Sequence, residues 1–144
     1  MSPILRPACP PDWPAIAALL DAAHLPLAGA EAHLDAFVVA ARADGAIVGA
    51  GGLEIHGAAA LLRSIVAEPR GTGLGSALVT RLIDDARARG LRDLVLLTTT
   101  AAAFFPRFGF VPVTREAVPA ALHASAELRG ACPASATVMH LRLS

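Results

Sequence analysis

The sequence contains no lysine, tyrosine, asparagine or glutamine among its 144 residues. Without lysine the chain cannot form a Schiff base or build a phosphate-binding P-loop, and without tyrosine it has no phenol to act as a general acid. The 12 basic residues, all arginine, equal the 12 acidic residues in number, which argues against a nucleic-acid-binding surface or a polybasic membrane anchor. There is also no run of the roughly 18 uninterrupted apolar residues that a membrane-spanning helix needs. We therefore expect neither a nucleic-acid partner nor a membrane partner.

Cysteine is scarce as well, with only Cys9 and Cys132 present. An exported disulfide scaffold usually carries more cysteines, so two unpaired thiols are expected. The first residues lack the charged leader and apolar run of an export signal, which predicts a cytoplasmic protein. With 55% apolar residues, the chain can bury one sizeable core, so residues 1–144 are expected to form a single domain. A homodimer is expected only because homodimers are the commonest soluble oligomers.

Apolar periodicity and turn residues predict a mixed α/β (α+β) sheet. The first half is expected to contain a strand over 4–8, a helix over 11–23 capped by Asp12, a looser helix over 29–34, and an antiparallel meander of strands over 36–42, 46–55 and 59–66. The second half is expected to contain an amphipathic helix from Leu74 to Gly90, a buried strand over 94–97, a brief helix over 101–107, a strand over 110–113, a helix over 118–125 and a strand over 137–143. The predicted order is β-α-(α)-β-β-β-α-β-α-β-(α)-β.

A glycine-rich segment lies between the last strand of the meander and the amphipathic helix. Glycine lets successive backbone N–H groups converge, and a helix N-terminus adds partial positive charge, so such a loop can hold a phosphate or pyrophosphate. The alternative is an ordinary glycine-rich turn, but the strand-loop-helix setting favours the phosphate site. The predicted binding residues are Arg70, Gly71, Thr72, Gly73, Leu74, Gly75 and Ser76.

The spacing Arg70-x-x-Gly73-x-Gly75 resembles the Arg/Gln-x-x-Gly-x-Gly/Ala motif of the GNAT superfamily of N-acetyltransferases. Downstream, the segment from Thr98 to Phe110 resembles the stretch of that family that runs from its fifth strand to a Tyr-x-x-x-Gly-Phe phrase. The resemblance covers most of the chain from Ala46 to Val113. It implies a cytoplasmic enzyme that binds the pyrophosphate of acetyl-CoA in the glycine-rich loop and moves the acetyl group directly to the primary amine of a small molecule.

Three features depart from the pattern of this family. Phe105 stands where many members have a tyrosine that protonates the leaving thiolate, and Thr98 stands where many have an asparagine beside the pantetheine arm. The connection over residues 67–69 is one residue shorter than usual. Because Phe105 cannot donate a proton, a catalytically silent acyl-CoA-binding module is an alternative. A metal-dependent vicinal-oxygen-chelate enzyme has a similar phrase and is a second alternative, although the two βαβββ modules of that fold are not found.

Four shorter segments resemble a narrower group, the ArsN-type acetyltransferases found with arsenic-resistance genes. These segments are Gly52-Leu53-Glu54, Leu61-Leu62-Arg63-Ser64, Leu97-Thr98-Thr99-Thr100-Ala101 and Cys132-Pro133-Ala134-Ser135-Ala136. This resemblance implies that the acceptor is an amino acid or a toxic amino-acid analogue that carries arsenic or phosphorus.

Direct acetyl transfer needs an aligned thioester, a base for the ammonium group and donors for the tetrahedral oxyanion. In the family the donors are backbone N–H groups at a splay in the fourth strand, here near Ile65 and Val66. Glu54 interrupts an apolar strand and is the candidate base, with a pKa expected to rise if it is partly buried; the alternative is a glutamate on a solvated face. Arg63 is expected to bind a substrate carboxylate or oxyanion in a bidentate fork, or else to be a surface residue. Ser64 is a further candidate catalytic and substrate contact, expected on the opposite strand face from Arg63.

No metal site is expected. A site built from distant histidines and Glu54 would rest on residue types alone, because four of the five histidines have no tight ligand spacing. These four are His24, His33, His123 and His140. The fifth, His56, stands at a turn and is expected to be exposed to solvent. Cys132 precedes Pro133, and a lone cysteine in such a position is more often a small buried residue than a metal ligand.

Overall fold

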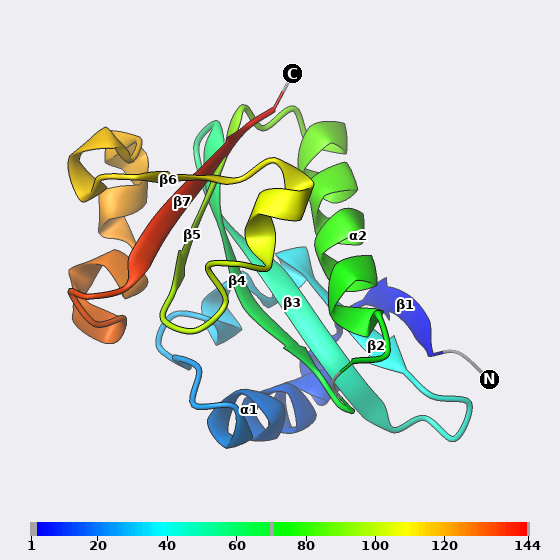
Figure 1. Ribbon diagram of the computed structural model, residues 1–144. Helices are drawn as coiled ribbons and strands as arrows, with labels where there is room; N and C mark the ends of the chain where they lie inside the picture. Colours follow the sequence, from blue (N-terminus) through cyan, green and yellow to red (C-terminus); the bar gives the residue numbers. More distant parts are fainter. Residues whose placement is uncertain (1–2, 70, 144) are drawn as a thin grey trace.

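The computed structural model describes residues 3–69 and 71–143, which form one seven-stranded mixed sheet and two α-helices (Figure 1). The strands stand in the order β1-β2-β3-β4-β5-β7-β6. Only β4 and β5 are parallel neighbours among these described strands. Neither described α-helix is long and apolar enough to cross a membrane. The elements are β1 (Ile4–Pro7), α1 (Trp13–Ala22), β2 (Phe37–Ala41), β3 (Ile47–His56), β4 (Ala59–Ala67), α2 (Leu74–Ala88), β5 (Asp93–Thr98), β6 (Val111–Val113) and β7 (Thr137–Arg142).

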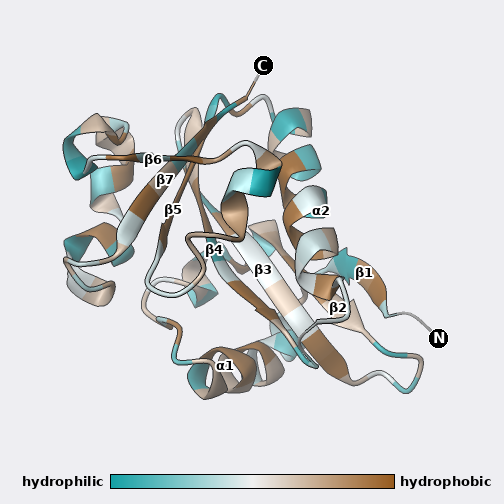
Figure 2. Ribbon diagram, viewed as in Figure 1, coloured by the Kyte–Doolittle hydropathy of each residue, from teal (hydrophilic) through white to brown (hydrophobic). Residues whose placement is uncertain are grey.

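The two α-helices cover opposite faces of the sheet. In α2 the apolar residues recur every three or four positions, and Leu78 and Leu82 are fully buried against one face. Successive residues of β2 point to the two faces, since Val38 joins the cluster beneath α2 while Val39 joins the cluster that contains Ile16 of α1. Figure 2 shows hydrophobic residues along β5 and parts of β3, whereas α2 carries hydrophilic residues on its exposed turns. The central strands of the sheet are therefore buried on both faces, whereas the edge strands β1 and β6 are partly exposed.

Glycines in the middle of β3 allow bulky side chains to press onto the sheet. A Cβ atom at Gly52 would collide with the ring of Phe37, which is 1% exposed. A Cβ atom at Gly51 would lie 2.5 Å from Cδ1 of Ile65. These two positions therefore require glycine because of close packing above and below the strand.

The predicted strands and the helix after the glycine-rich loop are confirmed, with small differences at their ends. Three expected helices are instead short 3₁₀ segments, each of six residues or fewer: Glu31–Ala36, Phe105–Phe108 and Ala120–Ala124. Such short segments lose too much conformational freedom for each hydrogen bond gained to form stable α-helices. Asp12 does not cap α1; its carboxylate accepts hydrogen bonds of 2.8 Å from Arg6 and from the backbone N–H of Cys9.

Candidate active site

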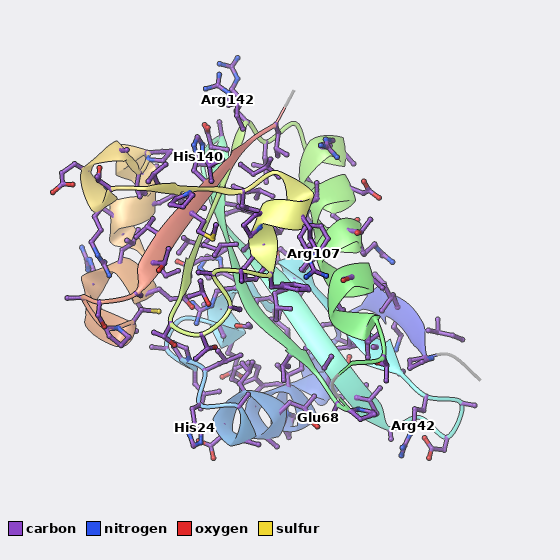
Figure 3. The ribbon with its side chains drawn as sticks, viewed as in Figure 1. His24, Arg42, Glu68, Arg107, His140 and Arg142 are labelled. Carbon is purple, nitrogen blue, oxygen red and sulfur yellow. The ribbon has the colours of Figure 1, made fainter. Side chains whose placement is uncertain are left out.

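The parallel strands β4 and β5 separate and leave a cleft between them. Among the described residues, the two strands are paired only over the first three residues of each, and Figure 1 shows them diverging beyond that point. The cleft has a volume of about 780 Å³. The second half of β4 forms one wall, and residues 96–101 form the other. His24, Glu68 and Arg107, labelled in Figure 3, come from three separate segments that also line the opening.

A β-bulge in β4 shapes the first wall. Arg63 pairs with Gly52 of β3, but Val66 pairs with Ala50, so β4 carries one extra residue between these pairs. Ser64 in the bulge has a φ of +63°, a left-handed conformation that costs a non-glycine residue about 1–3 kcal/mol. The bulge brings both Arg63 and Ser64 to the cleft, whereas strand alternation predicted opposite faces for them.

Ile65 and Val66, the residues expected to present backbone N–H groups, follow the bulge and line the cleft. In the part of the chain that the structure describes, β5 does not pair with this half of β4. The side chain of Val66 packs into the core on the α1 side of the sheet. Core packing by the side chain is therefore compatible with a binding role for the backbone on the strand edge.

The glycine-rich loop leads into the first turn of α2 at the cleft. Gly71 and Gly73 have φ values of +81° and +83°, and open space lies where a Cβ would stand at either position. Gly71, Gly73, Gly75 and Ser76 all line the cleft. The first backbone N–H groups of a helix have no partner within the helix, so this end of α2 can bind an anion.

The other residues of the predicted loop motif have different surroundings. Leu74 packs against the core beneath α2. The hydroxyl of Thr72 donates a hydrogen bond of 3.3 Å to the backbone carbonyl of Pro69. Arg70, the first residue of the motif, lies outside the described residues.

The second wall contains Thr98 and Phe105, which were both expected near the cosubstrate. The Thr98 hydroxyl accepts a hydrogen bond of 2.9 Å from the N–H of Ala101 and closes the turn after β5. Phe105 is 7% exposed, and its ring lies edge to face with Phe104 and Phe110 at centroid distances of 5.1 and 5.9 Å. Phe105 thus shapes the cleft by packing and offers no proton.

A buried ion cluster joins the first wall to neighbouring segments. The Arg63 side chain has no exposed area, and its Nη1 donates to Oε1 of Glu54 at 2.7 Å. Its Nε lies 3.4 Å from Oε2 of Glu127. Its Nη2 donates to the backbone carbonyls of Pro26 and Ala28 at 3.2 and 2.8 Å. One guanidinium therefore serves two carboxylates and fixes the loop after α1 against β3 and β4.

The two carboxylates in this cluster have pKa values displaced in opposite directions. Burial acts to raise the pKa of Glu54, but hydrogen bonds, chiefly from His56 and Arg63, outweigh it and lower that pKa. The predicted upward displacement is therefore wrong. Burial raises the pKa of Glu127 to about 6, with attraction to Arg63 opposing this effect and repulsion from Glu54 adding to it. Of these two carboxylates, only Glu127 lies among the described residues that line the cleft.

Glu127 is a candidate functional residue that the sequence patterns do not predict. It stands in an alanine-rich segment. The one feature that could have drawn attention to it is its position between the predicted helix over 118–125 and the segment that begins at Cys132. Cys132 and Cys9 are both free thiols, as expected. Burial raises the pKa of Cys132 to about 11, and the nearby charge of Glu127 adds to this effect, so this cleft-lining thiol is protonated at neutral pH.

Two histidines converge on Glu54 from the side away from Arg63. Nε2 of His56 lies 2.7 Å from Oε2 of Glu54, and Nε2 of His33 lies 3.9 Å from the same oxygen. The expectation of a solvent-exposed His56 is wrong, because its side chain is only 22% exposed and bonded to the carboxylate. The sequence gives no hint of this group, since the two histidines are far apart and follow no ligand spacing.

Comparison with known proteins adds a family match. The model described as "Acetyltransferase (GNAT) family" matches residues 1–110. No curated protein sequence matches the chain.

Solved structures share the fold over nearly the whole chain. The protein Rv2747 from Mycobacterium tuberculosis, in complex with CoA and NLQ, is 27% identical with a TM-score of 0.80, covering 99% of this chain and 100% of that one. N-acetylglutamate synthase from Neisseria gonorrhoeae, complexed with CoA and N-acetyl-glutamate, is 24% identical with a TM-score of 0.81, covering 98% of this chain and 35% of the synthase. A GNAT acetyltransferase from Staphylococcus aureus is 13% identical with a TM-score of 0.79, covering 98% and 99% of the two chains. The chain thus spans about a third of the synthase, and matches the other two over their full length.

Proposed function

The chain belongs to the GNAT family of acetyltransferases, and we propose that it transfers the acetyl group of acetyl-CoA directly to the primary amine of a small amino acid or amino-acid analogue. The observation that carries the proposal is the cleft, which brings together an anion-binding helix end, an open strand edge and a buried carboxylate. Rv2747 is described with CoA, and the N-acetylglutamate synthase with CoA and an acetylated amino acid, which supports an acceptor of this class.

The glycine-rich loop fits the pyrophosphate of acetyl-CoA. No side chain fills the space above Gly71 and Gly73, so the loop backbone can approach a phosphate closely. The backbone N–H groups of Ile65 and Val66 would hold the pantetheine arm and polarise the thioester carbonyl at the edge of β4. Thr98 and Phe105 would border the arm on the opposite wall.

Glu127 is the carboxylate that we assign as general base. It lies in the cleft, and its pKa of about 6 leaves it deprotonated at neutral pH yet more basic than an ordinary glutamate. The acceptor ammonium would give its proton to Glu127, and the free amine would then attack the thioester carbonyl. Collapse of the tetrahedral intermediate would break the carbon–sulfur bond. The CoA thiolate would take a proton from water or from the positively charged nitrogen of the tetrahedral intermediate, which leaves a neutral amide, because Phe105 cannot supply one.

Glu54 and Arg63, which the sequence indicated as base and substrate ligand, are assigned positioning roles in this proposal. Glu54 has a lowered pKa, which makes its carboxylate a weaker base. The donors of Arg63 already serve two carboxylates and two backbone carbonyls, so a substrate carboxylate would have to displace one of them. Ser64, expected as a catalytic and substrate contact, would instead act through the bulge, where its left-handed backbone turns the edge of β4 toward the cleft.

The test is a turnover screen with acetyl-CoA and a panel of primary amines that includes the common amino acids and their phosphorus- and arsenic-containing analogues. Release of CoA thiol together with a mass-identified N-acetylated product supports the enzyme. Titration calorimetry with acetyl-CoA separates the rival case, because a silent acyl-CoA-binding module would bind without turnover. Binding should be lost in Gly73→Glu and kept in Gly45→Glu, which places the same charge on a glycine of similar φ in an exposed hairpin away from the cleft.

Three further proposals, an ArsN-type role, a cytoplasmic location and a homodimer, each have a separate test. An ArsN-type role predicts that arsenic- or phosphorus-containing amino acids have a higher kcat/KM than the parent amino acids. A cytoplasmic location and a homodimer are checked by cell fractionation and by light scattering of the purified protein. A vicinal-oxygen-chelate enzyme is no longer an alternative, because the described residues form one sheet of a different fold.

A further inference from the structure

His33, Glu54 and His56 bring three metal-ligand atoms together in a small volume outside the cleft. The nearest such atoms of the three side chains all lie within 4.8 Å of one another. His33 comes from the 3₁₀ segment Glu31–Ala36, while Glu54 and His56 lie near the end of β3. The three residues are therefore joined by the packing of two separate elements and not by local sequence.

The geometry of this group is close to that of a tetrahedral metal site. Ligand atoms around a tetrahedral Zn²⁺ lie roughly 3.3 Å apart, given Zn–N and Zn–O distances of about 2.0–2.1 Å. Oε2 of Glu54 is 2.7 Å from Nε2 of His56 and 3.9 Å from Nε2 of His33. A small movement of the histidine rings, whose centroids are 5.6 Å apart, would place all three atoms around one ion.

The surroundings of Glu54 suit a ligand as well. Its other oxygen, Oε1, accepts a hydrogen bond of 2.7 Å from Nη1 of Arg63, which fixes the carboxylate and leaves Oε2 facing the two imidazoles. Hydrogen-bonded support of this kind is what orients metal-ligating carboxylates in proteins. The His33 and His56 side chains are 28% and 22% exposed, so an ion can reach the group from solvent and keep a water ligand.

We propose that His33, Glu54 and His56 bind one divalent transition-metal ion, of which Zn²⁺ is the representative. Two imidazoles and one carboxylate form a ligand set that Zn²⁺ favours, whereas Mg²⁺ and Ca²⁺ prefer oxygen ligands alone. The ion would replace the hydrogen bond between His56 and Glu54 and would cross-link the segment Glu31–Ala36 to β3. The site lies beyond the acetyl-transfer chemistry, and its test does not depend on turnover.

The experiment titrates Zn²⁺ into untagged, chelator-treated protein by calorimetry and follows thermal unfolding with and without the ion. We expect one ion per chain and a rise in Tm of roughly 5–10 °C at a free Zn²⁺ concentration about 100 times the Kd. His33→Ala and His56→Ala should each weaken binding by about 100-fold or more, and Co²⁺ should give visible absorption bands of a nitrogen- and oxygen-ligated site.

Two control variants make the result specific. His123→Ala removes an exposed histidine outside the group, and Cys9→Ser removes the exposed thiol; both should bind Zn²⁺ like the parent protein. Circular dichroism confirms that each variant is folded before titration. The proposal is overturned by the absence of saturable binding, by unchanged affinity in either histidine variant, or by loss of binding in Cys9→Ser.

Discussion

Glu127→Gln is expected to stabilise the protein at neutral pH. Glu127 is 4% exposed, and its pKa is about 6 against an ordinary value of 4.5. At 1.36 kcal/mol for each pKa unit, this difference corresponds to about 2 kcal/mol that the folded protein loses when Glu127 ionises. Glutamine has nearly the same shape and carries no charge, so it removes this cost.

The sign of the pH dependence follows from the direction of the pKa change. Because the folded-state pKa is raised, the contribution of protonated Glu127 is fully present below about pH 4.5 and is lost as the pH rises through about 6. The parent protein should therefore lose about 2 kcal/mol of unfolding free energy across this window relative to Glu127→Gln. Above about pH 7 the difference between the two proteins should be constant.

Urea unfolding of both proteins is measured at about pH 4 and at about pH 8. The change in their stability difference between the two pH values gives this quantity, because the titration of groups that do not interact with Glu127 cancels. The reasoning would be refuted if the difference in unfolding free energy between the variant and the parent were the same at both pH values. A variant that is less stable only at the higher pH would refute it as well, because that result would mean that the charge of Glu127 stabilises the fold through Arg63.

The same variant tests the proposed base. Loss of a general base typically lowers the rate by about 10²–10⁴-fold, which is about 3–5 kcal/mol of activation free energy. In the parent enzyme kcat/KM should fall as the pH drops through about 6, and this acid limb should be absent in Glu127→Gln. An unchanged rate and pH profile would show that another group accepts the proton.

Three other substitutions have defined outcomes. Gly52→Ala should lower the free energy of unfolding by about 1–3 kcal/mol in urea unfolding, because its Cβ overlaps the ring of Phe37. Phe105→Tyr should raise kcat by up to about tenfold in steady-state kinetics if protonation of the thiolate limits turnover, and an unchanged kcat would show that it does not. Glu54→Gln should keep activity and move the acid limb below pH 6, because the charge of Glu54 helps to raise the pKa of Glu127; loss of turnover in a folded variant would instead make Glu54 the base.

Much of the fold follows from local patterns in the sequence. The four-residue spacing of Leu74, Leu78 and Leu82 predicts α2 because it aligns apolar side chains on one helix face. Gly71 and Gly73 predict the loop because its left-handed backbone favours glycine at both positions, whereas Gly75 lies in the first turn of α2. Both signals act within one turn or one loop, so they can be recognised without knowledge of the rest of the chain.

The ion cluster could not be predicted in this way. Arg63 meets Glu54 across the β3–β4 hairpin, on the side of the bulge nearer the turn, and it meets Glu127 through a segment that folds back from the far end of the sheet. Strict alternation along β4 gives the wrong face for the residues beyond the bulge, because the extra residue shifts the alternation by one position. Residues so far apart in sequence become neighbours only through the topology of the whole fold. The residue type at each position therefore does not indicate the contact.

Glu54 and Glu127 have different environments, and these give the two carboxylates different proposed roles. Both approach the same guanidinium, but Glu54 receives a donor at 2.7 Å from Arg63 and another at 2.7 Å from His56, whereas Glu127 lies 3.4 Å from Nε of Arg63. Strong donors hold Glu54 in its charged form, while burial with a weaker partner makes Glu127 the better proton acceptor. Since Glu54 neutralises part of the charge on Arg63 and repels Glu127, it helps to keep Glu127 basic. Under the proposed mechanism, Glu54, which is not among the described residues that line the cleft, would set the pH range in which Glu127 accepts a proton.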